Sequence, residues 1–295
     1  MKPAAYVYHR AYDVREAVEL LGELGEDAKI LAGGQSLVAM MNFRLARPSA
    51  LVDVNRISGL SYLRRDGDRL RIGALTRHRA VETTRDPAVL GGYAVLPRAA
   101  HWVGHYPIRT RGTFGGSIAH ADPTSEWCML ALLLDAEFVA EGPHGRRTIP
   151  AAGFFQGFLT TALSPDEMLV EVVFPRPAPH AALTEFAQRR GDFAIVAAAA
   201  ALDIDGDGGG NTGGMTCTGA RIVLGGVDAR PVRVPAAEQA LAGAALTGDA
   251  FAAAADVAAR EVSPPSDVHG SADYRRRLVR TLLTRALEEA AAHGA

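Results

Sequence analysis

The sequence predicts a protein of mixed helices and strands that is divided into two domains. Three observations support this class. The chain has 295 residues, which exceeds the about 100–200 residues of one typical domain. Segments with a helical period of apolar residues alternate with short apolar runs that are typical of strands. A proline-rich stretch, FPRPAPH at 174–180, is the best linker, because proline disfavours both helix and strand pairing.

The first part of the chain predicts a compact unit of strands and helices. Apolar residues within 13–24 fall on one helical face, and Gly25 follows as a stop signal. The further expected elements are a buried strand at 29–32, a helix at 37–45 ended by Pro48, and a strand at 50–54. A glycine loop therefore joins the first strand to the second helix.

The middle of the chain begins with a hairpin signal. In YLRRDGDRLRIGAL, residues 62–75, alternating arms flank a turn at Asp66-Gly67. The expected elements after it are a helical segment at 79–106 with a break around Gly91-Gly92, a helix with Pro123 near its first turn and a cap from Asp122 or Thr124, and a strand at 136–140.

The last part of the chain predicts strands followed by alanine-rich helices. The expected elements are strands at 194–204 and 220–227, a polar glycine-rich tip at 205–214 between them, and helices at 236–260 and 271–292. The arginine run at 275–277 is expected on the solvated face of the last helix. No internal repeat is evident.

Composition excludes several classes of function. The 31 basic and 33 acidic side chains give a net charge of −2, so nucleic acid is not an expected partner. The start lacks the apolar core of a signal peptide, and the longest apolar runs are short of the ~20 residues of a membrane span, which predicts a cytoplasmic protein. Two cysteines cannot build a four-cysteine iron–sulfur or zinc site.

Two glycine loops are the strongest signals of a binding site. Gly33-Gly34-Gln35-Ser36 follows a predicted strand and opens a helix, and Gly115-Gly116-Ser117 has the same form. Such a place exposes backbone N–H groups beside a helix dipole and suits a diphosphate. Alone, each pair is also compatible with a turn that needs positive φ. Neither loop fits the dinucleotide fingerprint or the nucleoside-triphosphate loop, so another phosphate-bearing cofactor is indicated.

Four stretches carry a resemblance to a known family. They are LAGGQSLVAMMNFRLARPSALVDVNRI at 31–57, RGTFGGSIAHADPTSEW at 111–127, LGGVDARPVR at 224–233 and GSADYRRRLVRTLLTRAL at 270–287. In this order they resemble the FAD-binding medium subunit of the molybdenum hydroxylases, the family of xanthine dehydrogenase and aerobic carbon monoxide dehydrogenase.

The resemblance implies an α+β fold and an FAD site. A two-lobed flavin domain of the vanillyl-alcohol-oxidase type is expected at 1–176, with lobes at about 1–57 and 58–176, followed by a carbon monoxide dehydrogenase flavoprotein-type domain at 182–292. The residues implied at the two pyrophosphate loops are Ala32, Gly33, Gly34, Gln35, Ser36, Leu37, Thr113, Gly115, Gly116 and Ser117.

Four further positions are implied at the flavin. Glu126 stands where relatives place an acidic residue, often aspartate, and Asp122 is a nearby carboxylate that could serve instead. Leu169 matches a position that contacts the flavin ring, and Phe193 is the candidate for an aromatic ring over it. Each also has a plainer interpretation: a surface glutamate at a helix start for Glu126, and core packing for Leu169 and Phe193.

The implied function is electron transfer within a complex. The molybdenum cofactor is expected on a large molybdopterin-binding subunit and two [2Fe–2S] clusters on a small subunit, in a heterohexamer with two of each chain. FAD in this chain would pass the electrons to an external acceptor. The alternatives are a stand-alone flavin oxidase of a small molecule and a scaffold subunit that has lost FAD.

Other chemistries find little support. His101 and His105 lack the glutamate and third ligand of a zinc helix, so no metal is expected. DIDGDG at 203–208 imitates the start of a calcium loop, but its twelfth position is Gly214 rather than glutamate. No G-x-S-x-G nucleophile motif is present, and no catalytic residue is predicted.

Overall fold

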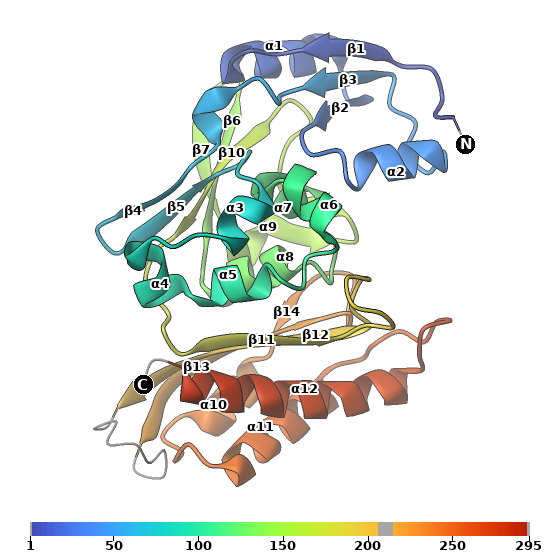
Figure 1. Cartoon of the computed structure of the whole chain (residues 1–295). Coiled ribbons are helices and arrows are strands. Elements are labelled where there is room, and N and C mark those ends of the chain that lie inside the picture. Colours follow the sequence, from blue (N-terminus) through green and yellow to red (C-terminus); the bar gives the residue numbers. More distant parts are fainter. Residues whose placement is uncertain (1, 206–214, 294–295) are drawn as a thin grey trace.

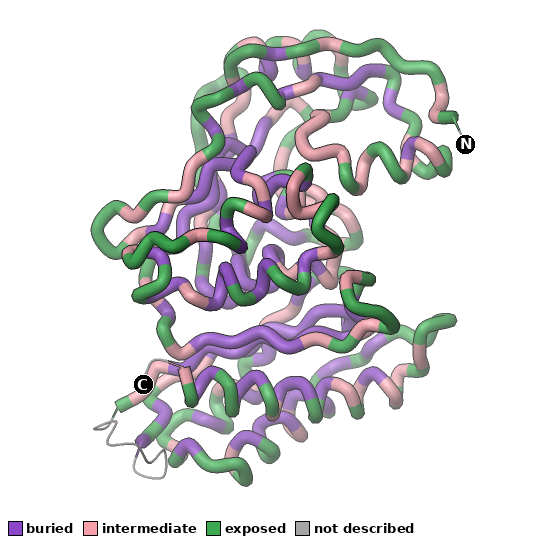
Figure 2. Tube along the Cα trace, viewed as in Figure 1, coloured by how far each residue is buried: buried purple, intermediate pink, exposed green. Residues whose placement is uncertain are grey.

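The structure is a computed structural model that describes residues 2–205 and 215–293. Figure 1 shows three layers in chain order: a small N-terminal lobe, a middle lobe, and a C-terminal domain with long helices on its outer side. Figure 2 shows that buried residues concentrate along the sheets and on the helix faces turned toward them. The glycine-rich segment 206–214, with most of the calcium-like motif, lies outside the described residues.

The N-terminal lobe is a small parallel sheet with helices. It contains β1 (Val7–Arg10), α1 (Val14–Leu24), β2 (Ala28–Leu31), α2 (Leu37–Asn42), β3 (Ala50–Asp53) and the 3₁₀ helix η1 (Ser58–Leu60). The strand order is β1-β3-β2. The predicted helix and strands are confirmed, but α2 is shorter than predicted. It ends at Asn42 because the chain turns at Arg44, which has a left-handed φ of 58°.

The middle lobe is an antiparallel sheet in the order β4-β5-β10-β6-β7, covered by short helices. The lobe contains β4 (Leu63–Asp66), β5 (Arg69–Gly73), β6 (Glu137–Gly142), β7 (Gly145–Pro150) and β10 (Met168–Phe174) in that sheet and, in a separate two-stranded sheet, β8 (Phe155–Gly157) and β9 (Thr160–Thr161). Its helices are α3 (His78–Glu82), α4 (Pro87–Tyr93), α5 (Val95–Ala99), α6 (Tyr106–Arg111), α7 (Phe114–His120), α8 (Glu126–Leu133) and α9 (Ala151–Phe154). The predicted hairpin is confirmed, with Gly67 at a φ of 60°.

The break predicted around Gly91-Gly92 lies slightly later, at Ala94 between α4 and α5. Both glycines lie inside α4, and the helical segment is also interrupted earlier, before Pro87. The Asp86 side chain accepts a hydrogen bond from the Ala88 N–H, so it caps a new helix whose first residue is that proline. Gly92 instead allows close packing, since a Cβ there would lie 2.6 Å from Pro177 Cβ.

The predicted N-terminal cap of α8, Asp122 or Thr124, was wrong. Ser125 caps α8, and its hydroxyl accepts from the Cys128 N–H. Asp122 is engaged elsewhere, because its Oδ1 accepts from the Thr124 N–H at 2.9 Å and from the Thr124 hydroxyl at 2.7 Å. Pro123 therefore belongs to a turn that precedes the helix.

The C-terminal domain is a four-stranded antiparallel sheet with helices on one face. It contains β11 (Ala181–Phe186), β12 (Val196–Asp205), β13 (Thr216–Gly225), β14 (Val232–Arg233), α10 (Pro235–Leu241), α11 (Gly248–Glu261) and α12 (Ala272–Ala292). The segment predicted as helical at 236–260 is two helices, and β13 begins earlier than the predicted strand at 220–227. No helix among the described residues is long and apolar enough to cross a membrane.

The alanine run of β12 joins this domain to the middle lobe. Ala197, Ala199 and Ala201 belong to the core of the middle lobe. Ala198 and Ala200, on the opposite face, belong to the core under the C-terminal helices. Because side chains alternate across a strand, small residues on both faces let one strand pack between two layers.

Arg275 departs from the prediction of a solvated arginine run. Its side chain is buried and donates to the carbonyls of Ile195 and Gly226 and, at 2.7 Å, to Asp267 Oδ2. These carbonyls stand just before β12 and just after β13, and within the described residues no backbone N–H donates to them. A buried donor is needed there because an unpaired buried carbonyl is costly.

We expect Arg275→Leu to lower the free energy of unfolding by about 2–3 kcal/mol, since two carbonyls and a carboxylate lose their donor. Chemical denaturation followed by circular dichroism measures this change. Arg277→Leu, at an exposed position of the same helix, is the matched control and should change stability by less than about 0.5 kcal/mol. Equal effects of the two substitutions would contradict the assigned role.

Candidate functional site

A cavity of about 620 Å³ lies where the two N-terminal lobes and the loop before β12 meet. It is lined by the loop after β2, the start of α7, the turn before α8, the end of β9 and the loop before β12. All fourteen residues predicted from the sequence line it: Ala32, Gly33, Gly34, Gln35, Ser36, Leu37, Thr113, Gly115, Gly116, Ser117, Asp122, Glu126, Leu169 and Phe193. The structure therefore brings together every candidate.

The first glycine loop presents free backbone donors. Gly34 has a φ of 71°, and the loop turns there from β2 into α2. Within the described residues, the N–H groups of Gly34, Gln35 and Ser36 have no hydrogen-bond acceptor. The Gln35 side chain donates to the Gly33 carbonyl at 2.9 Å and so braces the loop. Three unpaired donors beside a helix start suit an anionic group.

The second glycine loop differs from the predicted form. Helix α6, not a strand, precedes it, and its glycines lie inside the first turn of α7. Its amides are already paired. Gly115 donates to the Ala74 carbonyl at 2.9 Å, Gly116 to Thr113 Oγ1 at 3.2 Å, and Ser117 to the Thr113 carbonyl at 3.1 Å. The expectation of a second row of free amides is therefore wrong, because the helix-capping pattern uses them.

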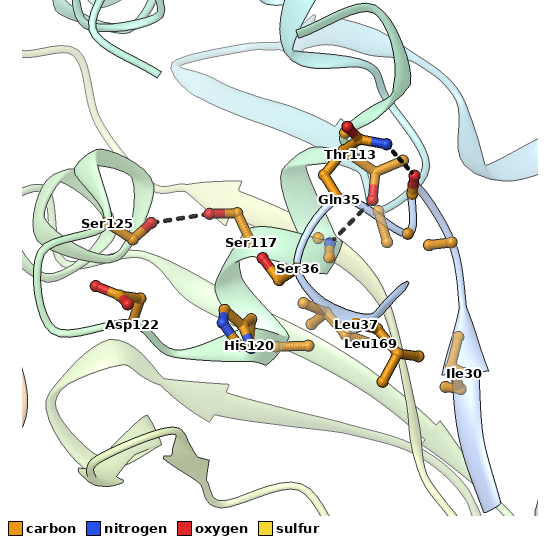
Figure 3. Close-up of a pocket in the computed structure, with 18 of the residues that line it drawn as sticks. Ile30, Gln35, Ser36, Leu37, Thr113, Ser117, His120, Asp122, Ser125 and Leu169 are labelled. Carbon is orange, nitrogen blue, oxygen red and sulfur yellow. Dashed lines mark hydrogen bonds between the residues drawn. The ribbon is translucent and has the colours of Figure 1, made fainter. Parts of the chain in front are cut away.

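Hydroxyl groups take the place of those amides. Thr113 Oγ1 accepts from Gly116, which leaves its own proton available to donate. Ser117 Oγ and Ser125 Oγ lie 2.8 Å apart, so one of their two protons remains for a ligand. Figure 3 shows Ser36 of the first loop and Thr113 and Ser117 of the second around the same space. The two loops thus offer different kinds of donor.

Close packing explains the glycines of both loops. A Cβ at Gly33 would lie 2.5 Å from the Arg111 carbonyl oxygen and 2.6 Å from Gly112 Cα. A Cβ at Gly115 would lie 2.5 Å from Ala74 Cβ. Contacts this short exclude a side chain. The first loop therefore packs against the peptide that leads into the second loop, and the second loop packs against Ala74, which follows β5.

Two carboxyl groups, one of them in the cavity wall, have raised pKa values. Glu126 is the first residue of α8 and lines the cavity, so it is not a plain surface glutamate. Burial raises its pKa to about 7, and the charge of Asp122 adds to the shift. Burial likewise raises the pKa of Glu185, on β11, to about 8, with the charge of Glu126 adding. Ionisation of Glu126 therefore raises the pKa of Glu185, a carboxyl group of the other domain.

A neutral histidine forms another part of the wall. Trp127 Nε1 donates to His78 Nδ1 at 3.0 Å, and both side chains are buried. Burial lowers the pKa of His78 to about 3, and the charges of Arg77 and Arg109 add to the shift. Because the indole nitrogen only donates, Nδ1 must accept and the proton must lie on Nε2. His78 is thus a fixed, uncharged imidazole.

The two apolar candidates occupy different environments. Leu169 lies in β10, is 5% exposed and contributes both to the core and to the cavity wall. Phe193 lies in the loop before β12 and is 69% exposed, so it is not a core residue. A large aromatic side chain is thus left on the rim of the cavity.

The sequence analysis missed two residues that line the cavity, Ser125 and His78, and one carboxyl coupled to it, Glu185. Ser125 could have been found, because it directly precedes an apolar helical run. His78 and Glu185 carry no local signal, since their contacts come from distant parts of the chain. His101, once considered as a metal ligand, pairs with the Glu82 carboxylate at 3.1 Å. Among the residues that the structure describes, no three histidine, cysteine or acidic side chains cluster in a way that could hold a metal ion.

Comparisons with known proteins give two family matches along the chain. The family described as the FAD binding domain in molybdopterin dehydrogenase matches residues 3–177. The family described as the CO dehydrogenase flavoprotein C-terminal domain matches residues 181–290. Together the two matches cover most of the chain.

Similar proteins extend over the whole chain. It is 41% identical over 293 residues to the 6-hydroxypseudooxynicotine dehydrogenase complex subunit alpha of Paenarthrobacter nicotinovorans, covering 98% of this chain and 96% of that one. Among solved structures, it is similar to carbon monoxide dehydrogenase from Hydrogenophaga pseudoflava, with a TM-score of 0.92, 40% identity and 99% of each chain covered. Quinoline 2-oxidoreductase from Pseudomonas putida 86 gives a TM-score of 0.91 and 37% identity, again covering 99% of each chain.

The carboxyl pair generates a prediction about pH. Because the folded-state pKa values of Glu126 and Glu185 exceed the ordinary value of 4.5, the folded protein holds protons that the unfolded chain has lost. Stability should therefore fall as the pH rises from about 5 to about 8. Glu126→Gln with Glu185→Gln should flatten this dependence and add on the order of 1 kcal/mol at pH 8.

Thermal unfolding of the ligand-free protein between pH 5 and 8 measures the effect. Glu23→Gln, at an exposed position of α1, is the control and should leave the pH profile unchanged. A wild-type profile as flat as that of the double variant would show that the carboxyls are not coupled to folding.

Proposed function

Because the chain belongs to the FAD-binding medium subunits of the molybdenum hydroxylase family, we propose that it relays electrons within such a complex. It accepts them from [2Fe–2S] clusters of a partner subunit and passes them to an external acceptor. The observation that carries this proposal is the single cavity in which both glycine loops meet.

The residues of the cavity fit FAD. A volume of about 620 Å³ lies within the ~300–1,000 Å³ of typical cofactor sites. The free amides of Gly34, Gln35 and Ser36 suit one side of a diphosphate, and the hydroxyls of Thr113 and Ser117 suit the other. The carboxyls of Asp122 and Glu126 can accept hydrogen bonds from ribose hydroxyls.

When bound, FAD supplies the ability to exchange both single electrons and electron pairs. The chain supplies binding and orientation. Leu169 offers an apolar contact for the ring system from the cavity wall, and Phe193 offers an aromatic cover from the rim. Among the described residues that line the cavity, no side chain must act as a general base. The site residues are therefore proposed as cofactor ligands rather than catalytic groups.

The same proposal requires partners. The only two cysteines, Cys128 and Cys217, are both buried, so the clusters must be held by another chain. We infer a small [2Fe–2S] subunit and a large molybdopterin-binding subunit, two of each in a heterohexamer. One relative is named as the medium chain of carbon monoxide dehydrogenase and another as a subunit of a dehydrogenase complex, which supports assembly. A cytoplasmic location stays a prediction.

Dependence on a partner is directly testable. We expect the FAD-loaded chain alone to show no bleaching of flavin absorption with purines, aldehydes, nicotine-like heterocycles or carbon monoxide under anaerobic conditions. Mixing it with a chemically reduced [2Fe–2S] subunit from the same complex should bleach the flavin. Reduction by a small substrate without any partner would instead favour a stand-alone oxidase.

Binding should depend on the close approach of the two loops. Gly33→Ala places a Cβ against the Arg111 carbonyl and should raise the dissociation constant for FAD about tenfold or more. Quenching of flavin fluorescence on titration of the FAD-free protein measures it. Gly22→Ala, in α1 with open space around its Cβ, is the matched control and should bind FAD as the wild type does. Unchanged affinity in Gly33→Ala would contradict the loop contact.

A further inference from the structure

A chain of hydrogen bonds links the two lobes behind the cavity. It begins at the first glycine loop, where Asn55 Nδ2 donates to the Ala32 carbonyl at 2.7 Å and to the Leu31 carbonyl at 3.3 Å. Asn55 follows β3 in the N-terminal lobe. It therefore holds the peptide groups at which β2 passes into the glycine loop.

The chain continues through an arginine of the middle lobe. Arg77 Nη2 donates to Asn55 Oδ1 at 2.9 Å, and Arg77 Nη1 donates to the Arg111 carbonyl. That carbonyl is the same oxygen against which Gly33 packs. One guanidinium thus joins the end of α6, just before the second loop, to the residue that holds the first loop.

The backbone of Arg77 is itself fixed beneath the second loop. Arg77 and Thr113 form an isolated antiparallel bridge. On either side of it, Phe114 donates to the Thr76 carbonyl at 2.8 Å and His78 donates to the Gly112 carbonyl at 3.2 Å. The arginine therefore reaches across the lobe boundary from a backbone segment that is hydrogen-bonded on both sides.

The orientation of the Asn55 amide is also fixed. Its own backbone N–H and its Nδ2 both donate to Asp53 Oδ1, at 2.8 and 2.7 Å, and Asp53 Oδ2 accepts from the Tyr8 hydroxyl at 2.5 Å. Although burial opposes it, these hydrogen bonds hold the pKa of Asp53 below its ordinary value. With only acceptors around Nδ2, the amide oxygen must face Arg77.

We propose that Asn55 and Arg77 form an interlobe clamp that fixes the spacing of the two glycine loops and thereby sets the affinity for FAD. Neither side chain lines the cavity proposed to hold FAD, so both are positioning residues. The clamp rests on the proposed function, because only a ligand held by both loops senses their spacing. Asparagine suits its place because it donates on one side and accepts on the other.

Lysine cannot replace the arginine in this role. The planar guanidinium presents its donors in a fork, and Arg77 uses two of them toward different lobes. A lysine ammonium keeps the charge but lacks that fixed geometry. Arg77→Lys therefore separates the geometric role from the electrostatic one.

The test compares FAD binding by the full-length wild type, Arg77→Lys, Asn55→Ala and the double variant, each stripped of FAD. Fluorescence titration should give a dissociation constant raised about tenfold in each single variant. Because the two residues act as one unit, the double variant should be no weaker than the weaker single variant. Arg85→Lys, at an exposed position of the same lobe, is the control and should bind like the wild type.

The outcomes separate the clamp from the cofactor assignment. If the wild type does not bind FAD, the proposed function fails. If the wild type binds and both single variants bind equally well, or if the effects of the two substitutions simply add, the clamp is overturned. Thermal unfolding of the FAD-free proteins reports whether each variant folds. If Asn55→Ala does not fold, the test rests on Arg77→Lys, and wild-type affinity for FAD in that variant overturns the clamp.

Discussion

The site depends on one close contact, the passage of the first glycine loop against the peptide that leads into the second. A side-chain carbon at Gly33 would overlap the Arg111 carbonyl and Gly112. Since glycine is the residue that permits such an approach of two backbones, the contact requires a glycine at position 33 of the first loop. The contact brings free amides from one lobe and hydroxyls from the other to the same cavity.

The C-terminal domain completes this site through packing rather than through a motif. Alanines on both faces of β12 let the strand lie between two cores. That placement holds Phe193 at the rim of the cavity and brings Glu185 within electrostatic reach of Glu126. The middle lobe therefore supports both of its neighbours. The N-terminal lobe contributes the first glycine loop, and the C-terminal domain contributes Phe193 at the rim of the cavity.

The sequence predicted the parts of the site that are local and missed the parts that are not. Glycine pairs, the hairpin turn at Gly67 and the stop at Gly25 each depend on neighbouring residues, so their patterns were readable. The helix cap at Ser125 was misassigned because several capping residues stand side by side, and only the fold decides between them. His78, Glu185 and buried Arg275 depend on partners far along the chain, and no local pattern reveals such contacts. The second loop shows a further limit, because a glycine pair does not reveal whether its amides are already paired.

The central claim is that both loops grip one diphosphate with different donors. An experimental structure of the FAD-loaded chain tests it most directly. The account predicts diphosphate oxygens within about 2.7–3.2 Å of backbone nitrogens among Gly34, Gln35 and Ser36 and of a hydroxyl of Thr113 or Ser117. A diphosphate that contacts one loop alone, or that lies outside this cavity, would contradict it.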